Sequence, residues 1–112
     1  MILMISSQGN SVNSKPNPRF GRTPWFIKYH TADGTWTAVE NPAMNEPGGA
    51  GVAAAQCLID QTTEVAISGR FGPNASRALQ AAGIKCYVFD NESESVNKVI
   101  EQFSAGQLKE SR

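Results

Sequence analysis

Three glycine-bearing segments, two of which also carry arginine, offer the chemistry best suited to ligand binding in this sequence. The candidate binding residues are Arg19, Gly21 and Arg22 in the first segment, Gly48, Gly49, Ala50 and Gly51 in the second, and Gly69, Arg70, Gly72 and Asn74 in the third. Glycine lets backbone N–H groups approach a ligand closely, and arginine supplies positive charge and several hydrogen-bond donors. The three segments together therefore predict a site for an anion.

The residues that usually carry out catalysis or hold a metal are few and scattered. The only histidine, His30, is predicted to lie exposed near the end of a strand, where a metal-ligand role stays open. Cys86 alternates with Ile84 and Val88 and is predicted to lie in the core, whereas Cys57 is predicted to lie on the side of a helix. No second histidine and no Cys-x-x-Cys pair supports a metal site made only of protein ligands. We therefore expect a binding protein and not an enzyme.

The elements that must position these segments follow from the hydrophobic pattern. Strands are predicted over residues 1–5, 25–31, 36–39, 65–67 and 84–89, where apolar, aromatic and β-branched residues are concentrated. Helices are predicted over residues 52–60, from residue 73 to the glycine at 83, and from residue 96 to the glycine at 106. The first strand is apolar throughout, which predicts a central place in the sheet. Residues from Leu108 onward are predicted to fray.

Individual residues predict the turns, caps and helix faces. Asp33-Gly34 is typical of a tight hairpin turn between the second and third strands. Ser93 or Ser95 is suited to cap the third helix, because a serine hydroxyl can accept a hydrogen bond from a free backbone N–H. The residues expected on the buried face of the first helix are Val52, Ala55 and Ile59, with Leu58 at its edge.

The order of elements, β-β-β-α-β-α-β-α, spans 112 residues, a length that predicts a single domain over residues 1–112. A hairpin followed by βαβ units predicts an α/β fold: a five-stranded mixed sheet with one antiparallel strand and helices on both faces. In such a sheet the loop after the first strand and the starts of the first two helices share the carboxyl edge, where ligands bind. The three glycine-bearing segments are expected to meet there, with two helix N-termini facing the ligand.

Charge and composition restrict the class of partner. Ten Lys and Arg against ten Asp and Glu give a net charge of zero, with a pI near 6.6. This balance disfavours nucleic acid or an anionic membrane as a partner. Two cysteines are too few for a disulfide framework, and the apolar opening is too short for a membrane span. We expect a cytoplasmic protein, and the sequence is compatible with a monomer or an oligomer.

Two other functions fit the same residues. The glycine-bearing segments and helix N-termini would also suit a phosphorylated small molecule or a nucleotide. If the glycines only turn the chain, the protein would instead be a protein-interaction adaptor. The hairpin aromatics Trp25, Phe26 and Trp36 would then form its contact surface.

Nearly the whole chain also resembles the dinitrogenase iron-molybdenum cofactor biosynthesis family, of the NifX and NafY type, in the order and spacing of its motifs. The motifs that carry the resemblance are Pro18-Arg19-Phe20-Gly21-Arg22-Thr23-Pro24-Trp25-Phe26, Glu40-Asn41-Pro42, Gly48-Gly49-Ala50-Gly51, Gly72-Pro73-Asn74-Ala75 and Phe103-Ser104-Ala105-Gly106-Gln107-Leu108-Lys109. Many relatives have His-Gly-Gly in the second segment. This chain has Pro47 in place of that histidine, so the resemblance assigns no direct metal ligand here.

The resemblance implies a ribonuclease-H-like α/β fold and a non-catalytic protein that binds or carries an iron-sulfur or molybdenum-containing cluster during metallocofactor assembly. Cluster donor or acceptor proteins would be its partners. Such clusters commonly carry negative charge, so the arginines at 19, 22 and 70 and the N–H groups of residues 49–51, Gly72 and Asn74 would hold one through charge and hydrogen bonds. Nuclease activity is not expected, because residues 1–5 lack the acidic metal ligand that such nucleases need.

Overall fold

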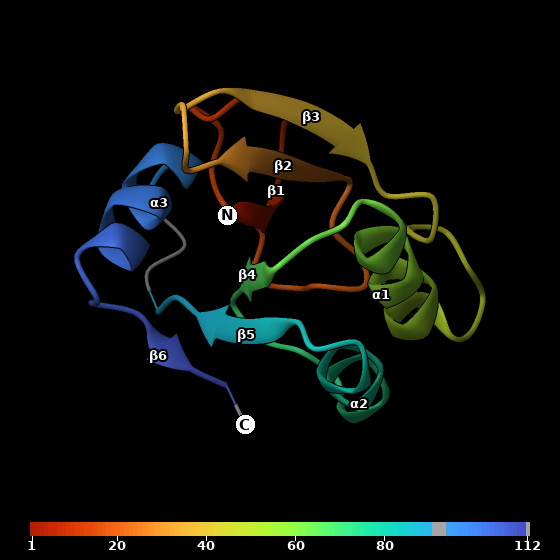
Figure 1. Ribbon diagram of the computed structural model, residues 1–112. Helices are drawn as coiled ribbons and strands as arrows, with labels where there is room; N and C mark the ends of the chain where they lie inside the picture. The colour runs from red at the N-terminus through yellow and green to blue at the C-terminus, as the bar shows by residue number, and fades with distance from the viewer. Residues whose placement is uncertain (91–93, 112) are drawn as a thin grey trace.

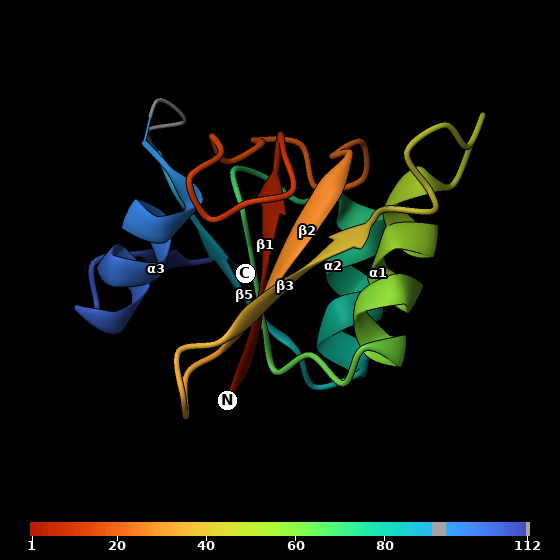
Figure 2. The ribbon, with the colours of Figure 1, turned by 90° about the horizontal axis from the view of Figure 1, so that it is seen from above.

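Six strands form one mixed sheet at the centre of the molecule, with helices on both of its faces (Figure 1). The computed structural model describes residues 1–90 and 94–111. The strands are β1 (Ile2–Ser7), β2 (Trp25–His30), β3 (Trp36–Glu40), β4 (Val65–Ser68), β5 (Lys85–Val88) and β6 (Lys109–Glu110). The helices are α1 (Ala50–Asp60), α2 (Pro73–Ala81) and α3 (Val96–Ser104). Seen from above, α1 and α2 cover one face of the sheet and α3 covers the other (Figure 2).

The sheet has the strand order β3-β2-β1-β4-β5-β6. Strand β1 lies between an antiparallel neighbour, β2, and a parallel one, β4, while β5 continues the parallel part. The α/β class, the β2–β3 hairpin, the central first strand and the helices on both faces are therefore confirmed. Because β1, β4 and β5 run in the same direction, their carboxyl ends share one edge of the sheet.

The strand count of five, with one antiparallel strand, is wrong, because the segment predicted to fray forms β6. This two-residue strand pairs antiparallel with β5, placing Lys109 opposite Val88 and Glu110 opposite Tyr87. The N–H of Ser111 donates to the Cys86 carbonyl at 2.7 Å. Without these bonds the outer backbone groups of β5 would be unpaired. Because β6 forms through backbone hydrogen bonds, its residues need not be hydrophobic, and the sequence pattern does not reveal the strand.

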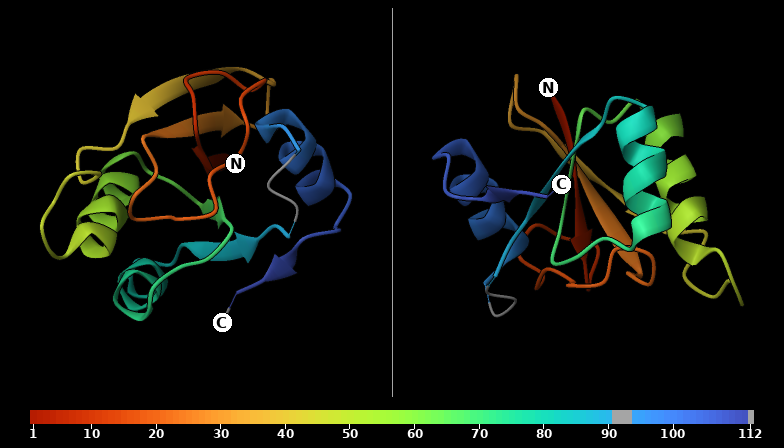
Figure 3. Two further views of the ribbon diagram at one scale, coloured as in Figure 1. Left: turned by 180° about the vertical axis from the view of Figure 1, so that it is seen from behind. Right: turned by 90° about the horizontal axis from the view of Figure 1, so that it is seen from below.

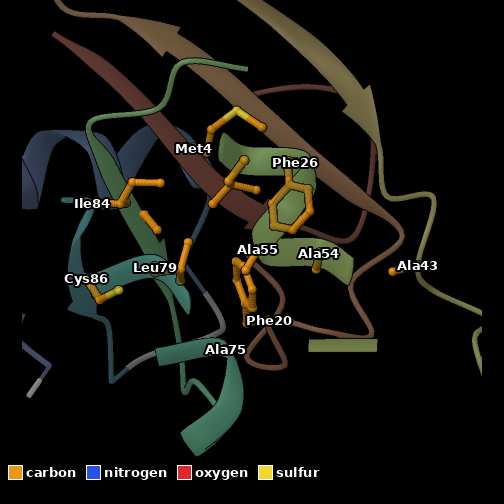
Figure 4. Packing of buried hydrophobic residues seen from close by; sticks show 12 residues of the cluster. Met4, Phe20, Phe26, Ala43, Ala54, Ala55, Ala75, Leu79, Ile84 and Cys86 are labelled. Carbon is orange, nitrogen blue, oxygen red and sulfur yellow. The ribbon is translucent and has the colours of Figure 1, made fainter. Parts of the chain in front are cut away.

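Two hydrophobic cores lie on the two faces of the sheet. The core under α1 and α2 contains Met4, Phe26 and Leu58, and its packing is shown in Figure 4. The core under α3 contains Leu3 and Ile5 together with residues of α3. Successive residues of β1 thus point into opposite cores, which explains why the whole strand is apolar. Cys86, only 2% exposed, belongs to the first core, as predicted.

Helix α1 begins at Ala50, two residues before the predicted start; Ala55 and Leu58 are buried and Ile59 packs against the core as predicted, but Val52 does not. The buried residues of α1 are Ala50, Ala54, Ala55 and Leu58, whereas Val52 is 46% exposed. The cause is close packing of α1 on α2: a Cβ added at Gly51 would lie 3.3 Å from the Ala75 Cβ, so small residues occupy this contact.

Helix α3 is capped by Ser95, one of the two predicted caps: its hydroxyl accepts a hydrogen bond from the Lys98 N–H at 3.1 Å. The other predicted cap, Ser93, lies outside the described residues. Over residues 1–90 and 94–111, no helix combines the length and the apolar content that crossing a membrane requires.

Candidate functional site

A hollow of about 420 Å³ lies at the carboxyl edge of the sheet, lined by the loop after β1 and the starts of α1 and α2. Figure 2 shows β1, α1 and α2 from above. The predicted binding residues that line the hollow are Arg19, Gly21, Arg22, Gly49, Ala50, Gly51, Arg70, Gly72 and Asn74. The other lining residues are Phe20, Val52, Phe71, Pro73 and Ala75. The structure therefore brings all three glycine-bearing segments together, as their places in the fold predict.

Two of the predicted residues, Gly48 and Gly69, do not line the hollow. A Cβ added at Gly69 would lie 2.6 Å from the Pro18 Cα, so this glycine allows the first and third segments to approach each other. Gly48 lies in an exposed loop, and a Cβ there would meet nothing within 4 Å. Gly69 thus has a packing role that its sequence context does not reveal.

Arg19 and Arg70 lie side by side because their backbones pair in a parallel β-bridge. The Arg70 N–H donates to the Pro18 carbonyl at 2.9 Å, and the Phe20 N–H donates to the Arg70 carbonyl at 3.4 Å. Both arginines are exposed, and neither has a carboxylate at ion-pair distance in the part of the chain that the structure describes. Like charges on directly paired residues repel each other, so an anion bound beside them would be stabilised.

Arg22 has protein partners that the other two arginines lack. Its Nη1 donates to the carbonyl oxygens of Met44 at 3.0 Å and Glu46 at 2.6 Å, in the loop before α1. This guanidinium therefore lines the hollow and also anchors the loop that carries the second glycine-bearing segment. An arginine that hydrogen-bonds backbone carbonyls in this way has fewer free donors for a ligand.

Asn41, which is not among the predicted binding residues, connects the same two loops. Its Nδ2 donates to the carbonyl oxygens of Gly21 at 3.1 Å and Thr23 at 2.9 Å, while its Oδ1 accepts from the Ala43 N–H at 3.0 Å. The side chain is buried, so these bonds are shielded from water. The available signal was its place in the Glu40-Asn41-Pro42 motif, directly after a strand.

Both helices that begin at the hollow have glycine N-caps without a side-chain cap. Gly49, with a positive φ of 72°, precedes α1, and Gly72 precedes α2; neither first turn contains an acidic residue. Helix α3, which lies on the other face of the sheet, is capped by a serine side chain. The first N–H groups of α1, and in α2 those that follow Pro73, are therefore free to bind a ligand, and both helix dipoles favour an anion.

The hollow combines the positive charge of its arginines and helix N-termini with apolar walls. Phe71 lines it and packs on the buried Phe20, with ring centroids 5.0 Å apart. No histidine, cysteine, aspartate or glutamate is among the lining residues. Over the described ranges, 1–90 and 94–111, no group of three such residues could hold a metal ion. The residues present thus fit a ligand held by charge and hydrogen bonds.

The other reactive residues lie away from the hollow. His30 pairs with Ile2 near the N-terminus, at the opposite edge of the sheet (Figure 3), and is half-buried where exposure was expected. Cys57 is half-buried on α1, where burial and then the charge of Asp60 raise the pKa of its thiol. Burial, with a smaller contribution from Glu110, raises the pKa of Cys86 to about 11. None of these groups is placed to take part in binding at the hollow.

The family model of the dinitrogenase iron-molybdenum cofactor proteins matches residues 1–106, a range that includes all three glycine-bearing segments. The chain belongs to the dinitrogenase iron-molybdenum cofactor family. The expected resemblance is therefore confirmed. Membership of this family connects the chain with handling of the iron-molybdenum cofactor and with biosynthesis related to nitrogen fixation.

Two solved structures are similar to this member of the dinitrogenase iron-molybdenum cofactor family over nearly their whole length. The apo form of the orange protein from Desulfovibrio gigas is 32% identical, with a TM-score of 0.93 over 98% of this chain and 92% of that one. A candidate NifB protein from Thermotoga is 35% identical, with a TM-score of 0.85 over 97% of this chain and 91% of that one. No curated protein matches the chain.

Proposed function

We propose that this protein binds an anionic metal-sulfur cluster, of the iron-sulfur or iron-molybdenum type, in the hollow at the carboxyl edge. The observation that carries the proposal is the backbone pairing of Arg19 with Arg70, two exposed arginines that have no carboxylate partner within the described residues. Two uncapped helix N-termini add N–H donors to the same hollow. Family membership supports a metallocluster as the anion.

The walls of the hollow favour a sulfide-rich anion over a strongly hydrated one. Guanidinium groups are weakly hydrated, and Phe71, Val52 and Pro73 contribute apolar surface beside them. Binding there removes water from the ligand, which costs most for anions that hold water tightly. A sulfide anion spreads its charge over large, polarisable atoms, so it loses less hydration free energy when it enters the hollow.

We further propose that the cluster is cargo, passed between donor and acceptor proteins of metallocofactor assembly, and that the protein is not an enzyme. The polar side chains that line the hollow are three arginines and Asn74, none of which is a usual nucleophile or general base. The ribonuclease-H-like fold that the resemblance implies does not make the protein a nuclease, because β1 carries no carboxylate for nuclease chemistry.

The test is anaerobic purification with metal analysis, followed by titration with tetrathiomolybdate, a simple molybdenum-sulfide dianion, monitored by visible absorption. We expect saturable binding that the double variant Arg19→Gln/Arg70→Gln weakens about thirtyfold or more, because it removes two charge-assisted contacts. The matched control, Lys98→Gln/Lys109→Gln, also removes two positive charges, on α3 and β6, and should bind like the parent. Equal binding by all three proteins, or none by the parent under excess anion, would contradict the proposal.

A phosphorylated ligand remains the second candidate, because uncapped helix N-termini also suit phosphate. A nucleotide that raises the melting temperature where tetrathiomolybdate does not would establish it. The adaptor alternative has weaker support. Phe26, one of its three contact residues, is fully buried, and Trp25 is half-buried, whereas Trp36 is 38% exposed.

A further inference from the structure

We infer that the hollow selects anions that carry no proton, and that Arg77 contributes to this selection by positioning the side chain of Asn74. The inference rests on the proposed function and names the ligand class more closely: a fully deprotonated anion whose surface atoms only accept hydrogen bonds. It follows from the excess of hydrogen-bond donors over acceptors among the side chains and helix N-termini of the hollow.

The side chains of the hollow offer one acceptor atom, and it already accepts a hydrogen bond from the protein. Arginine has donors only, so among the polar lining side chains the single acceptor is the Oδ1 of Asn74. Arg77, an exposed residue one turn further along α2, donates to this oxygen from its Nη2 and does not itself line the hollow. Because a carboxamide has oxygen on one branch and NH₂ on the other, the branch left for a ligand is the donor.

Three backbone carbonyls in the same walls also accept hydrogen bonds from the protein. The carbonyl of Gly49 accepts from the Ala53 N–H at 3.0 Å, and that of Gly72 accepts from the Ser76 N–H at 2.9 Å. The carbonyl of Gly21 accepts from the Asn41 Nδ2 at 3.1 Å. At a helix N-terminus the carbonyls point into the helix and the N–H groups point out, so the ligand meets donors there as well.

A ligand that carries a proton would place its own donor against these donors. A ligand O–H that faces these donors would lose its hydrogen bond to water and gain none. The free-energy cost would be comparable to that of an unsatisfied buried polar group. Sulfate and hydrogen phosphate provide a matched comparison, because both are tetrahedral dianions and only hydrogen phosphate carries a proton. Tetrathiomolybdate, like sulfate, is free of protons.

The first experiment measures how well sulfate and hydrogen phosphate displace tetrathiomolybdate at pH 8. For the parent protein we expect sulfate to compete about tenfold better, which corresponds to one unsatisfied donor. The variant Asn74→Asp replaces the NH₂ donor with an acceptor and should reverse the preference toward hydrogen phosphate. An aspartate at this position is compatible with the fold, because acidic residues are favourable in the first turn of a helix.

The second experiment isolates the positioning by Arg77. We expect Arg77→Met to weaken sulfate binding about fivefold, and Arg77→Gln, which keeps an N–H donor for Asn74, to restore most of it. In an Asn74→Ala background, Arg77→Met should have no further effect, since the group it positions is absent. The control Lys98→Met removes one charge on α3. In nuclear magnetic resonance spectra of the parent, the Asn74 side-chain NH₂ signals should shift when sulfate is added.

The outcomes separate the two proposals. If the parent binds none of these anions, the proposed function fails. If it binds tetrathiomolybdate but sulfate and hydrogen phosphate compete equally, only the inference about protons is overturned. An additive effect of Arg77→Met in the Asn74→Ala background would show that Arg77 acts through its charge alone, and would overturn its positioning role.

Discussion

The glycines of the hollow differ in what a side chain would meet at each position, although the sequence presents them alike. Gly69 contacts the backbone of Pro18, whereas Gly72 has an ordinary φ of −69° and open space around it. Neither backbone conformation nor packing therefore explains a glycine at 72. Its position at the N-terminus of α2, lining the hollow, indicates that the space belongs to the ligand.

Gly72→Ala should therefore weaken tetrathiomolybdate binding severalfold and change the free energy of unfolding by less than about 1 kcal/mol. Gly69→Ala should instead destabilise the protein by about 1–3 kcal/mol, because the added Cβ overlaps backbone atoms of Pro18. Anion titration and chemical denaturation of both variants check the pair. If the Gly72→Ala variant binds tetrathiomolybdate like the parent, Gly72 does not contribute to the site.

Cys86 predicts a loss of stability at alkaline pH. Its thiol pKa is raised to about 11 in the folded protein, from an ordinary value of 9.0. Between these values the unfolded chain loses the thiol proton while the folded chain keeps it, so the free energy of unfolding falls as pH rises from 9 to 11. Denaturation across this range should show a shallower decline for Cys86→Ala than for the parent. Identical slopes would mean that other groups cause the decline.

At the scale of elements, the loop between β3 and α1 depends on contacts with the loop after β1. Arg22 holds the carbonyls of Met44 and Glu46, and the N–H groups of the same two residues bond to Asn41 and Ala43 carbonyls. This loop is exposed from Asn45 to Gly49 and carries the start of the second glycine-bearing segment. Arg22, which lies outside this loop, therefore adds to the loop's own backbone hydrogen bonds in ordering it near the hollow.

Arg22→Gln should speed hydrogen exchange at the Met44 and Glu46 amides and weaken anion binding about threefold, less than Arg70→Gln does. The comparison variant Arg70→Gln should weaken binding without changing exchange in that loop, because Arg70 has no hydrogen bond to it. Exchange followed by mass spectrometry, with anion titration, distinguishes the two roles. Unchanged exchange in Arg22→Gln would show that the loop is held by its own backbone bonds.

The meeting of the three segments could be predicted because it depends on strand order alone. Once β1 is central and the βαβ connections follow, the ends of β1 and β4 and the starts of both helices must share an edge. The exposure of Val52 on α1, the strand β6 and the bonds of Arg22 could not be predicted. Each depends on a contact between distant segments, such as Gly51 with Ala75 or Ser111 with Cys86, that no local pattern records.

At the scale of the whole molecule, a net charge of zero conceals an uneven distribution. Arg19, Arg22 and Arg70 line the hollow, and Arg77 contacts a fourth lining residue. Lysines lie on other elements, including Lys28 on β2, Lys85 on β5, Lys98 on α3 and Lys109 on β6. The field in the hollow is therefore positive although the chain as a whole is neutral.

Anion binding should consequently depend on salt even though the protein is neutral. Raising ionic strength from 0.01 M to 0.15 M shortens the screening length from about 30 Å to about 8 Å, and we expect the affinity for tetrathiomolybdate to fall about tenfold. Arg19→Gln/Arg70→Gln should lose most of this dependence, because the charges that act on the anion are removed. Duplex DNA should not bind at 0.15 M salt, since a single compact patch cannot contact many phosphates. Affinity that does not change with salt would mean that hydrogen bonds, and not the arginine charges, hold the anion.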